Sequence, residues 1–262
     1  MTRQRFLLWC GVVGGPLFIA VFLVNDRIRA GYDPVRDFVS EAAIGAGGGL
    51  QIANFLVTGA LAVAFGVAAR RAVSPWTGAL IAVFGLGLMV AGVFVSDPAP
   101  YVTARTAHGI IHDVASAFVF GSLTAAAFVA ARWRPAARWR WYCRLVGVAV
   151  PVLFVLAGGV QAATGVFQRL AIAIGFTWLS VLALRALRWL SVDLPQPAGR
   201  PGGGLPRPAG RPGVNLPRPA GGPGVDLPRP ADRPGVDPPE PVAPPDVDLS
   251  EPGLDGVEPT RS

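Results

Sequence analysis

The sequence contains no lysine, few charged residues and very little cysteine or histidine. All 23 basic residues are arginines, and charged residues make up 15% of the chain, against about 25% in a typical soluble domain. This composition excludes an ordinary soluble domain and is typical of a GC-rich bacterial genome. The two cysteines, Cys10 and Cys143, match no metal or redox spacing. Both fall near the side assigned below to the cytoplasm, so we expect them to be unpaired and to fill apolar space.

The charge that is present is unevenly distributed. Residues 1–192 hold 16 arginines and 6 acidic residues, whereas residues 193–262 hold 7 arginines and 10 acidic residues. In the first segment the arginines separate apolar runs. A nucleic-acid-binding protein would instead place them on a solvated face with aromatic residues between them. No nucleic-acid partner is therefore expected.

Six apolar runs are each long enough to cross a membrane as a helix, which takes about 20 residues. They are Phe6–Val24, Leu50–Ala69, Thr77–Val95, Ile110–Ala131, Leu145–Ala163 and Leu170–Leu190. Each run is apolar all round, whereas a helix on the surface of a soluble domain carries a polar stripe. The sequence therefore predicts an all-α, polytopic membrane bundle of six transmembrane helices over residues 1–192, with the lipid bilayer as its surroundings.

Arginine placement predicts the orientation of this bundle. With the N-terminus in the cytoplasm, the inner segments hold 11 arginines and the outer segments hold 5, as the positive-inside rule requires. The segment RWRPAARWRWYCR at 132–144 supplies five of the inner ones. The protein is therefore predicted to lie in the cell membrane with both termini in the cytoplasm.

Two pairs of small residues have the spacing that allows helices to approach closely. Gly11 and Gly15 form a GxxxG pair, and Gly87 and Ala91 form a small-xxx-small pair. Such pairs also arise by chance in a chain rich in glycine and alanine, so the pattern leaves both origins open.

The connection after the first run, residues 25–49, is too long for a simple turn. Within it, DPVRDFVSEAA predicts a short helix, with Asp33 as its N-cap and Pro34 in its first turn. Four apolar residues would share one face of that helix: Val35, Phe38, Val39 and Ala42. The pattern favours an amphipathic helix on the outer membrane interface, with a lid over the bundle as the alternative.

Residues 193–262 repeat a proline- and glycine-rich unit of eleven residues. The first four units begin at Leu194, Leu205, Leu216 and Leu227. Each unit offers too little apolar surface to offset the entropy of ordering it. Glycine does not recur at every third position, which excludes collagen. The segment is predicted to be a disordered cytoplasmic tail.

The stretch HGIIHDVAS at 108–116 places polar residues at the outer end of the fourth run. His108 and His112 lie four residues apart on one helix face, and Asp113 is beside them. Other polar residues fall at the same boundary: Gln51, Asn54, Asp97, Gln161, Gln168 and Arg169. Polar groups inside a membrane span usually face the bundle interior or a cavity. We therefore predict that His108, His112, Asp97 and Asp113 meet at one cavity that is open to the outside, near Asn54 and Gln161.

Several roles are compatible with this cluster. It is either a hydrogen-bonded network that orients the helix ends or a pocket for a small polar ligand or lipid headgroup. A third interpretation is a transition-metal site, such as zinc, held by His108 and His112 with Asp97, Asp113 or Glu41 as an acidic ligand. That site would make the protein a metal-dependent membrane hydrolase. A small transporter would favour polar or broken helices near the middle of the bilayer, whereas here the polar residues gather at one end.

Several segments together carry a family resemblance. They are Asp33-Pro34, QIANFLVTG at 51–59, GVFVSDP at 92–98, HGIIHDVAS at 108–116 and VFQRLAI at 166–172. In this order they resemble the bacterial six-span integral membrane protein family catalogued as domain of unknown function 998, over roughly residues 5–190. The resemblance implies a six-helix membrane protein of the cell envelope and no particular activity. It also implies that Asp97, His108 and His112 act beyond packing. The arrangement is similar, too, to membrane hydrolases that hold zinc with intramembrane histidine and aspartate, whose usual set includes more histidines.

Overall fold

Six long helices make up most of the chain that the computed structural model describes, which is residues 2–99, 104–134 and 136–192. The helices are α1 (Arg3–Ile28), α2 (Gly49–Ala72), α3 (Pro75–Val93), α4 (Ala107–Ala130), α5 (Ala137–Gly159) and α6 (Thr164–Val192). Two 3-10 helices, η1 (Val39–Ala43) and η2 (Gln161–Ala163), lie in the connections after α1 and α5. Each predicted span corresponds to one of the six helices, and all six are long and apolar enough to cross a membrane. The predicted all-α, polytopic fold is therefore confirmed, while the predicted tail at 193–262 lies outside the described residues.

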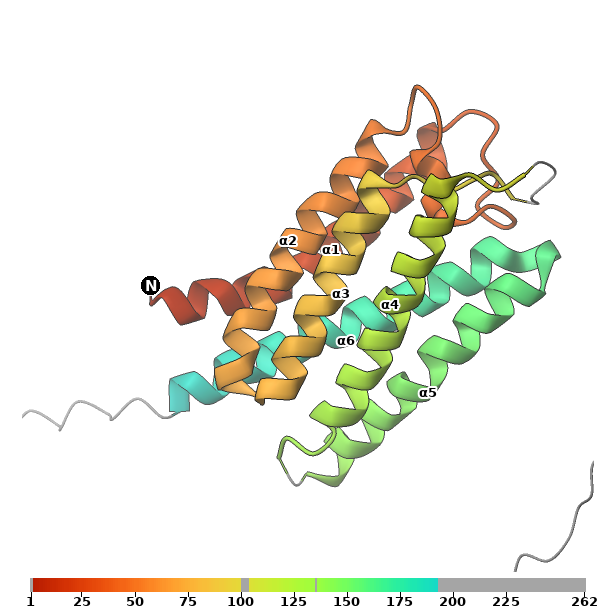
Figure 1. Cartoon of the computed structure of the whole chain (residues 1–262). Coiled ribbons are helices and arrows are strands. Elements are labelled where there is room, and N and C mark those ends of the chain that lie inside the picture. Colours follow the sequence, from red (N-terminus) through yellow and green to blue (C-terminus); the bar gives the residue numbers. More distant parts are fainter. Residues whose placement is uncertain (1, 100–103, 135, 193–262) are drawn as a thin grey trace, which may run out of the picture. The chain divides into compact units, whose positions relative to one another are not determined.

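The contacts between the long helices form a closed ring, and Figure 1 shows these helices side by side. Each helix packs against the next one in the sequence, and α6 packs against α1 to close the ring. Each connection joins neighbouring ends of two helices, so consecutive helices run in opposite directions (Figure 1). One end of the bundle holds the connections that contain η1 and η2 and the one between α3 and α4; we call it the loop end. The opposite end holds the start of α1, the α2–α3 and α4–α5 turns and the end of α6; we call it the arginine end.

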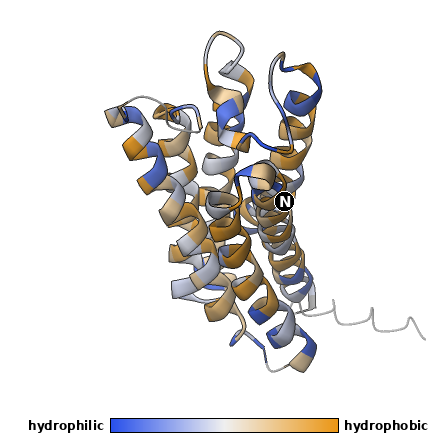
Figure 2. Cartoon of the chain, turned by 90° about the vertical axis from the view of Figure 1, so that its right-hand side faces the viewer, coloured by the Kyte–Doolittle hydropathy of each residue, from blue (hydrophilic) through white to orange (hydrophobic). Residues whose placement is uncertain are grey.

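Apolar residues cover the middle of every helix, and hydrophilic residues gather towards the two ends (Figure 2). Both sides of the ring are apolar because the inner side packs on other helices and the outer side faces lipid. Trp178 shows what the inner side buries: its side chain is fully covered, and its indole N–H donates to Cys143 Sγ at 3.3 Å. Both cysteines are buried and free, as expected for space-filling residues.

Glycines permit the closest helix contacts, among them the three glycines of the predicted pairs. A Cβ atom on Gly11 would lie 2.5 Å from the Phe65 ring, and one on Gly15 would lie 2.6 Å from the carbonyl oxygen of Phe176. A Cβ on Gly87 would lie 2.9 Å from Val119 Cγ2. All of these distances are shorter than a carbon atom tolerates, so these positions are confirmed as packing contacts of α1 with α2 and α6, and of α3 with α4.

Helix α5 begins at Ala137, two turns before the predicted span. The sequence analysis begins the fifth span at Leu145 and leaves residues 137–144, which carry three arginines, outside it. Arginine is a good helix former, and its long side chain reaches the water while its stem stays in apolar surroundings. The arginines therefore extend the helix past the apolar core instead of ending it.

The amphipathic helix predicted from DPVRDFVSEAA is wrong. Asp33 does accept the amide N–H of Val35, at 2.9 Å, but only a turn comes after it, and the regular structure is the 3-10 helix η1. Val39 and Ala42 are each 1% exposed, because η1 packs on α1, α2 and α6. The segment covers the loop end of the bundle, as the alternative prediction had it. The reason is that its amides find buried side-chain acceptors, such as Gln168, that an interfacial helix would not reach.

Candidate functional site

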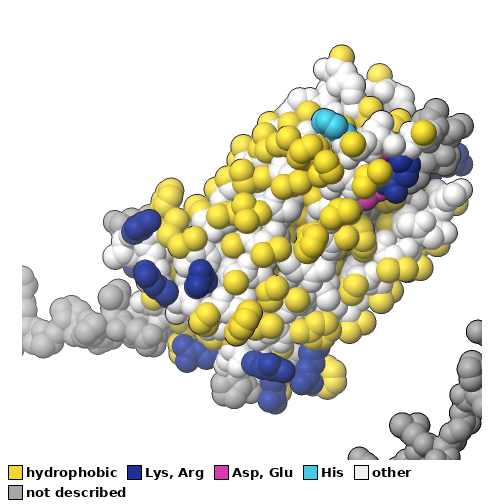
Figure 3. Space-filling model, in the orientation of Figure 1, with side chains coloured by type: hydrophobic (Ala, Val, Ile, Leu, Met, Phe, Trp, Pro, Cys, Tyr) yellow, Lys and Arg dark blue, Asp and Glu magenta, His cyan; other side chains and the backbone are white. Residues whose placement is uncertain are grey.

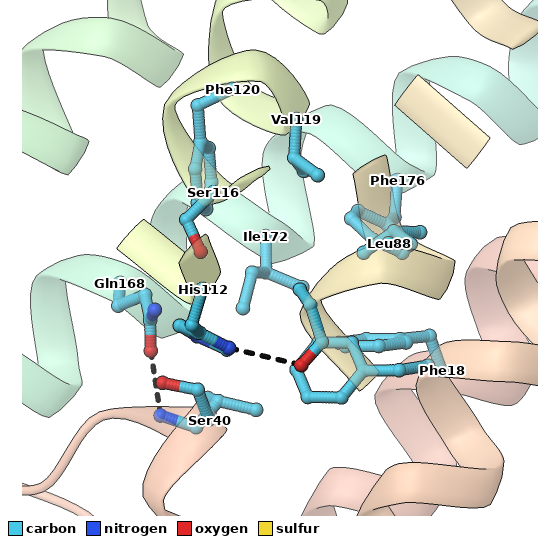
Figure 4. Close-up of a pocket in the computed structure, with 13 residues that line it drawn as sticks. Phe18, Ser40, Leu88, His112, Ser116, Val119, Phe120, Gln168, Ile172 and Phe176 are labelled. Carbon is cyan, nitrogen blue, oxygen red and sulfur yellow. Dashed lines mark hydrogen bonds between the residues drawn. The ribbon is translucent and has the colours of Figure 1, made fainter. Parts of the chain in front are cut away.

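A cavity in two parts lies at the loop end, beneath η1 and between α3, α4 and α6. The outer part has a volume of about 130 Å³ and is lined mainly by polar residues, among them Glu41, Ser96 and Asp97. The inner part has a volume of about 30 Å³ and is lined mainly by apolar residues of the core, among them Phe18 and Phe176 (Figure 4). Four residues line both parts: Ser40, His112, Ser116 and Gln168. The two parts therefore adjoin at four polar side chains, with the polar part towards the loop end and the apolar part in the aromatic core.

His112 is the histidine that lies inside the bundle. Its side chain is 3% exposed, and its Nδ1 lies 2.9 Å from the carbonyl oxygens of both Ala91 and Phe94. A carbonyl oxygen only accepts, so Nδ1 must carry the hydrogen. In the neutral ring, Nε2 is then a hydrogen-bond acceptor. The ring thus satisfies two carbonyls at the C-terminal end of α3, and His112 lines both parts of the cavity.

The other shared residues join three separate segments around this ring. Ser116 lies one turn after His112 on α4, and its hydroxyl points towards the histidine (Figure 4). Gln168, from α6, accepts the amide N–H of Val39 through Oε1 at 2.6 Å. This bond holds η1 over the cavity, so the position of the cover depends on a side chain of the last helix.

One buried hydroxyl in the outer part lacks a hydrogen-bond partner within the described residues. It is Ser96 Oγ. A buried hydroxyl without a partner costs free energy. A water molecule or a polar group of a ligand in the outer part would supply the missing bond.

Glu41 ties the first connection to the one between α3 and α4. Its two carboxylate oxygens accept the amide N–H groups of Phe38 and Ala99, each at 2.7 Å. Burial raises the pKa of the Glu41 carboxyl above its ordinary value, and the two hydrogen bonds from the backbone oppose that rise. Glu41 therefore fixes one wall of the outer part through its own connections.

Asp97 and Asp113 also line the outer part, and both have partners in the protein. Asp97 accepts from the backbone N–H of Thr106 at 2.9 Å and from its hydroxyl at 2.7 Å. These bonds lower the pKa of Asp97, the bond from the hydroxyl most of all. Asp113 forms an ion pair with Arg105. Both carboxylates thus position the start of α4 while they face the cavity.

The remaining predicted site residues lie elsewhere. His108 is on the surface, where its ring centroid lies 5.2 Å from that of Phe94. Asn54 is buried between α1 and α2 and donates to the carbonyl of Phe18 at 3.1 Å. Gln161 is exposed in η2. The structure therefore brings Asp97, His112 and Asp113 to one cavity, and it places His108, Asn54 and Gln161 outside its lining.

The residues do not fit the metal site considered from the sequence. Across residues 2–99, 104–134 and 136–192, no three His, Cys, Asp or Glu side chains lie close enough together to hold a metal ion. Two carbonyl oxygens already engage Nδ1 of His112, and His108 lies on the outer surface. The set of His108, His112 and Asp97 is therefore not assembled.

The sequence analysis missed a buried ion pair beside the cavity. Arg169 of α6 donates to Asp26 of α1 through Nε at 3.1 Å and Nη2 at 2.6 Å. The same side chain donates to the hydroxyl of Tyr32 at 2.6 Å and to the carbonyls of Asp37 and Gly165 at 3.1 Å. The sequence places Arg169 among the polar residues of the outer boundary but does not single out Asp26. The available signal was one acid in the last turn of α1 and one base near the start of α6, both at the same end.

A second missed pair, Asn25 and Gln51, links α1 to α2. Asn25 Nδ2 donates to Gln51 Oε1 at 2.9 Å, and both side chains are buried. Gln51 Nε2 has no hydrogen-bond partner within the described residues. The pair lies outside the lining of the cavity, and its hydrogen bond joins the two helices.

One protein-family model matches residues 12–185, and its description is "Protein of unknown function (DUF998)". No curated protein and no solved structure matches the chain. The matched region contains every residue that lines the two-part cavity, and it contains the pair of Arg169 and Asp26. The cavity is thus built entirely from the part of the chain that the family model covers.

Proposed function

The chain belongs to the family of proteins of unknown function DUF998, and we propose that it binds a small polar ligand or lipid headgroup in the two-part cavity at its loop end. The observation that carries the proposal is the sharing of Ser40, His112, Ser116 and Gln168 by a polar outer part and an apolar inner part. A pocket that combines apolar walls with a few placed polar groups is the usual form of a small-molecule site.

The outer part favours a ligand that donates hydrogen bonds. Its lining includes Glu41, Asp97 and His112, and the described residues of that lining include no arginine. Complementary charge therefore favours a hydroxyl or ammonium group over an anion. The inner part, at about 30 Å³, has room for one or two water-sized groups, because one water molecule needs about 10–15 Å³ of such cavity volume. A polar head with a short apolar end would match both parts.

The proposed orientation places this cavity on the outer side of the cell membrane. The arginine end is then cytoplasmic, as the positive-inside rule requires. Reporter fusions after Ala72 and Ala136 should report the cytoplasm, and fusions at Gly47 and Thr164 should report the exterior. A reversed pattern would place the cavity in the cytoplasm and would leave its ligand chemistry unchanged.

Two observations favour ligand binding over metal-dependent hydrolysis. Nδ1 of His112 engages helix carbonyls, and the described residues assemble no three-ligand set. A transporter would need polar groups near the bilayer midplane, and this cavity lies at one end of the bundle. Stoichiometric zinc in the purified protein that disappears on His112→Ala would overturn this choice.

The binding proposal is tested by filling the place where the two parts of the cavity adjoin, which Ser116 lines. Ser116→Leu puts three carbon atoms in place of a hydroxyl that lines both parts of the cavity, whereas Ala117→Leu places the same leucine side chain at the neighbouring exposed position of α4. The proteins are extracted from native membranes in mild detergent, and native mass spectrometry measures the molecules that remain bound. We expect a species that is retained by the wild type and by Ala117→Leu and is absent from Ser116→Leu. Identical spectra for all three proteins would refute the proposal, provided that Ser116→Leu remains helical and monodisperse.

A further inference from the structure

A second and larger cavity lies at the arginine end, between α4 and α5. Its volume is about 510 Å³, which is within the range of sites for small molecules and cofactors. Four arginines line it: Arg132, Arg134, Arg140 and Arg144. The first two come from the α4–α5 turn, and the last two lie one turn apart on α5. Basic side chains gather visibly at this end of the molecule (Figure 3).

The described residues provide no carboxylate near these four arginines. The six acidic residues among residues 1–192 all belong to the loop end: Asp26, Asp33, Asp37, Glu41, Asp97 and Asp113. The three ion pairs of the described residues lie there as well. Four guanidinium groups around one hollow repel one another unless an anion sits among them. The cavity therefore favours an anionic occupant.

Aromatic residues hold part of this arginine cluster in place. The guanidinium of Arg134 lies 4.0 Å from the ring centroid of Trp189, at the end of α6. That of Arg144 lies 5.8 Å from the ring centroid of Trp141. Such stacking restricts the guanidinium groups while it leaves their N–H donors available. Tryptophan is also the residue that settles at the headgroup level of a bilayer.

A strip of exposed apolar residues runs along α5 and begins beside Arg140 and Arg144, which line the cavity. Its residues are Trp141, Leu145, Val148, Val152 and Val155, with exposed fractions from 51% to 71%. Their spacing of three and four residues places them on one side of the helix. Of the six candidate spans, α5 is the least buried within the bundle. The strip is long enough to lie against an acyl chain.

We propose that this cavity binds the phosphate of an anionic phospholipid, with an acyl chain of that lipid lying along the exposed face of α5. Arginine forms paired hydrogen bonds with phosphate oxygens, and basic pockets between membrane helices bind such headgroups. The apolar strip selects a phosphate that carries an acyl chain over free phosphate. The proposal does not depend on the cavity at the loop end.

The test compares two double variants that remove equal charge from the same end of the protein. Arg140→Gln with Arg144→Gln alters the cavity, whereas Arg138→Gln with Arg188→Gln removes two exposed arginines outside its lining. Each full-length protein is delipidated in detergent and titrated with dioleoylphosphatidylglycerol or dioleoylphosphatidylcholine, and native mass spectrometry gives the affinities. A hydrogen bond to a charged group contributes about 1.5 kcal/mol, so losing one from each of two arginines should weaken phosphatidylglycerol binding about a hundredfold, at 1.4 kcal/mol per tenfold change.

The control variant should retain the wild-type affinity for phosphatidylglycerol to within about threefold, because a diffuse charge effect is screened by salt. An equal loss in both double variants would overturn the proposal, since it would mean attraction to a basic surface without a site. Equal affinity of the wild type for phosphatidylcholine would also overturn it. Displacement of the lipid by an equal concentration of inorganic phosphate would exclude the lipid as the source of the phosphate. Arg140→Lys with Arg144→Lys, which keeps the charge, should restore part of the affinity and shows that the site folds without the native guanidinium groups.

Discussion

The side chain of Arg169 joins α1, α6 and the first connection, so its removal should destabilise the bundle strongly. The side chains of Arg169 and Asp26 are 14% and 9% exposed, and Arg169 makes two hydrogen bonds to the carboxylate and three to other oxygens. Arg169→Met keeps most of the apolar stem and removes every donor. It leaves the carboxylate of Asp26 buried and without this partner, which typically costs about 3–5 kcal/mol.

A double-mutant cycle separates this cost from the net contribution of the pair. The second single variant is Asp26→Leu, and the double variant is Asp26→Leu with Arg169→Met. Both charges are then absent, and apolar side chains of similar size replace them. Replacing a whole buried ion pair in this way is often close to neutral, so the double variant should be more stable than either single variant. Unfolding in detergent, monitored by circular dichroism during a denaturant titration, supplies the four free energies.

Two results would refute this reasoning. The first is a loss of less than about 1 kcal/mol in Arg169→Met, which is typical of an exposed ion pair. The second is a double variant whose loss equals the sum of the single losses, because that result would mean that the two side chains do not interact. A coupling free energy near zero is expected only for residues without a shared contact.

Three single contacts lead to further predictions. Gly11→Val should lower the free energy of unfolding by about 1–3 kcal/mol, because a Cβ there meets the Phe65 ring, whereas Gly121→Ala, with open space around it, should be neutral or slightly stabilising. In the folded protein the pKa of Glu41 is raised above its ordinary value of 4.5. The contribution of the protonated Glu41 to stability is therefore present below that value and is lost as pH rises through the folded pKa. The melting temperature of the wild type relative to Glu41→Gln should fall as pH rises. His112→Ala should lower the free energy of unfolding by about 1–3 kcal/mol, and His108→Ala should leave it nearly unchanged.

Detergent-solubilised protein and thermal unfolding serve for all three comparisons. The packing argument fails if Gly11→Val and Gly121→Ala are equally stable. A wild-type melting temperature that rises relative to Glu41→Gln as the pH is raised through the carboxyl range would show that the hydrogen bonds to the Glu41 carboxylate outweigh its burial. Equal losses in the two histidine variants would contradict the assignment of His112 to the interior and His108 to the surface.

The spans could be predicted from the sequence because one physical requirement decides them. A chain inside a bilayer must satisfy its own backbone hydrogen bonds, so an apolar run of sufficient length becomes a helix whatever its neighbours are. The ends of the helices are a different matter. The start of α5 depends on whether arginines of the Ala137–Arg144 segment can reach water from a helix, and the hydrophobicity of a run does not contain that information.

The first connection shows why its structure could not be predicted in the same way. The local signal was sound, since Asp33 does accept an amide two residues later. The structure of the residues after this turn depends on partners far away in the sequence: Gln168 accepts the amide of Val39, and Glu41 accepts that of Ala99. These contacts compete with helix formation, and no local pattern reveals them. Burial of η1 is therefore a property of the assembled ring.

The two histidines show which feature of the site could not be predicted from the sequence. A spacing of four residues places them on one face of α4, but it gives no depth along that face. How deep each histidine lies in the bundle depends on where the neighbouring helix α3 ends. His112 lies level with the last carbonyls of α3 and is enclosed by them, whereas His108 lies one turn further out, beside the ring of Phe94. A sequence interpretation that combines the ends of neighbouring helices would have separated them.

The position of His112 also shows that a structural role and a binding role are compatible in one side chain. Its Nδ1 satisfies carbonyls at the end of α3, and this bond fixes the tautomer and the orientation of the ring. Because the ring is fixed, Nε2 has a defined direction without any contribution from a ligand, which is the condition for a preorganised site. Loss of stability in His112→Ala and loss of binding in Ser116→Leu therefore report different atoms of one arrangement. The Ser116 variant leaves the bonds of Nδ1 in place, so it isolates the binding role.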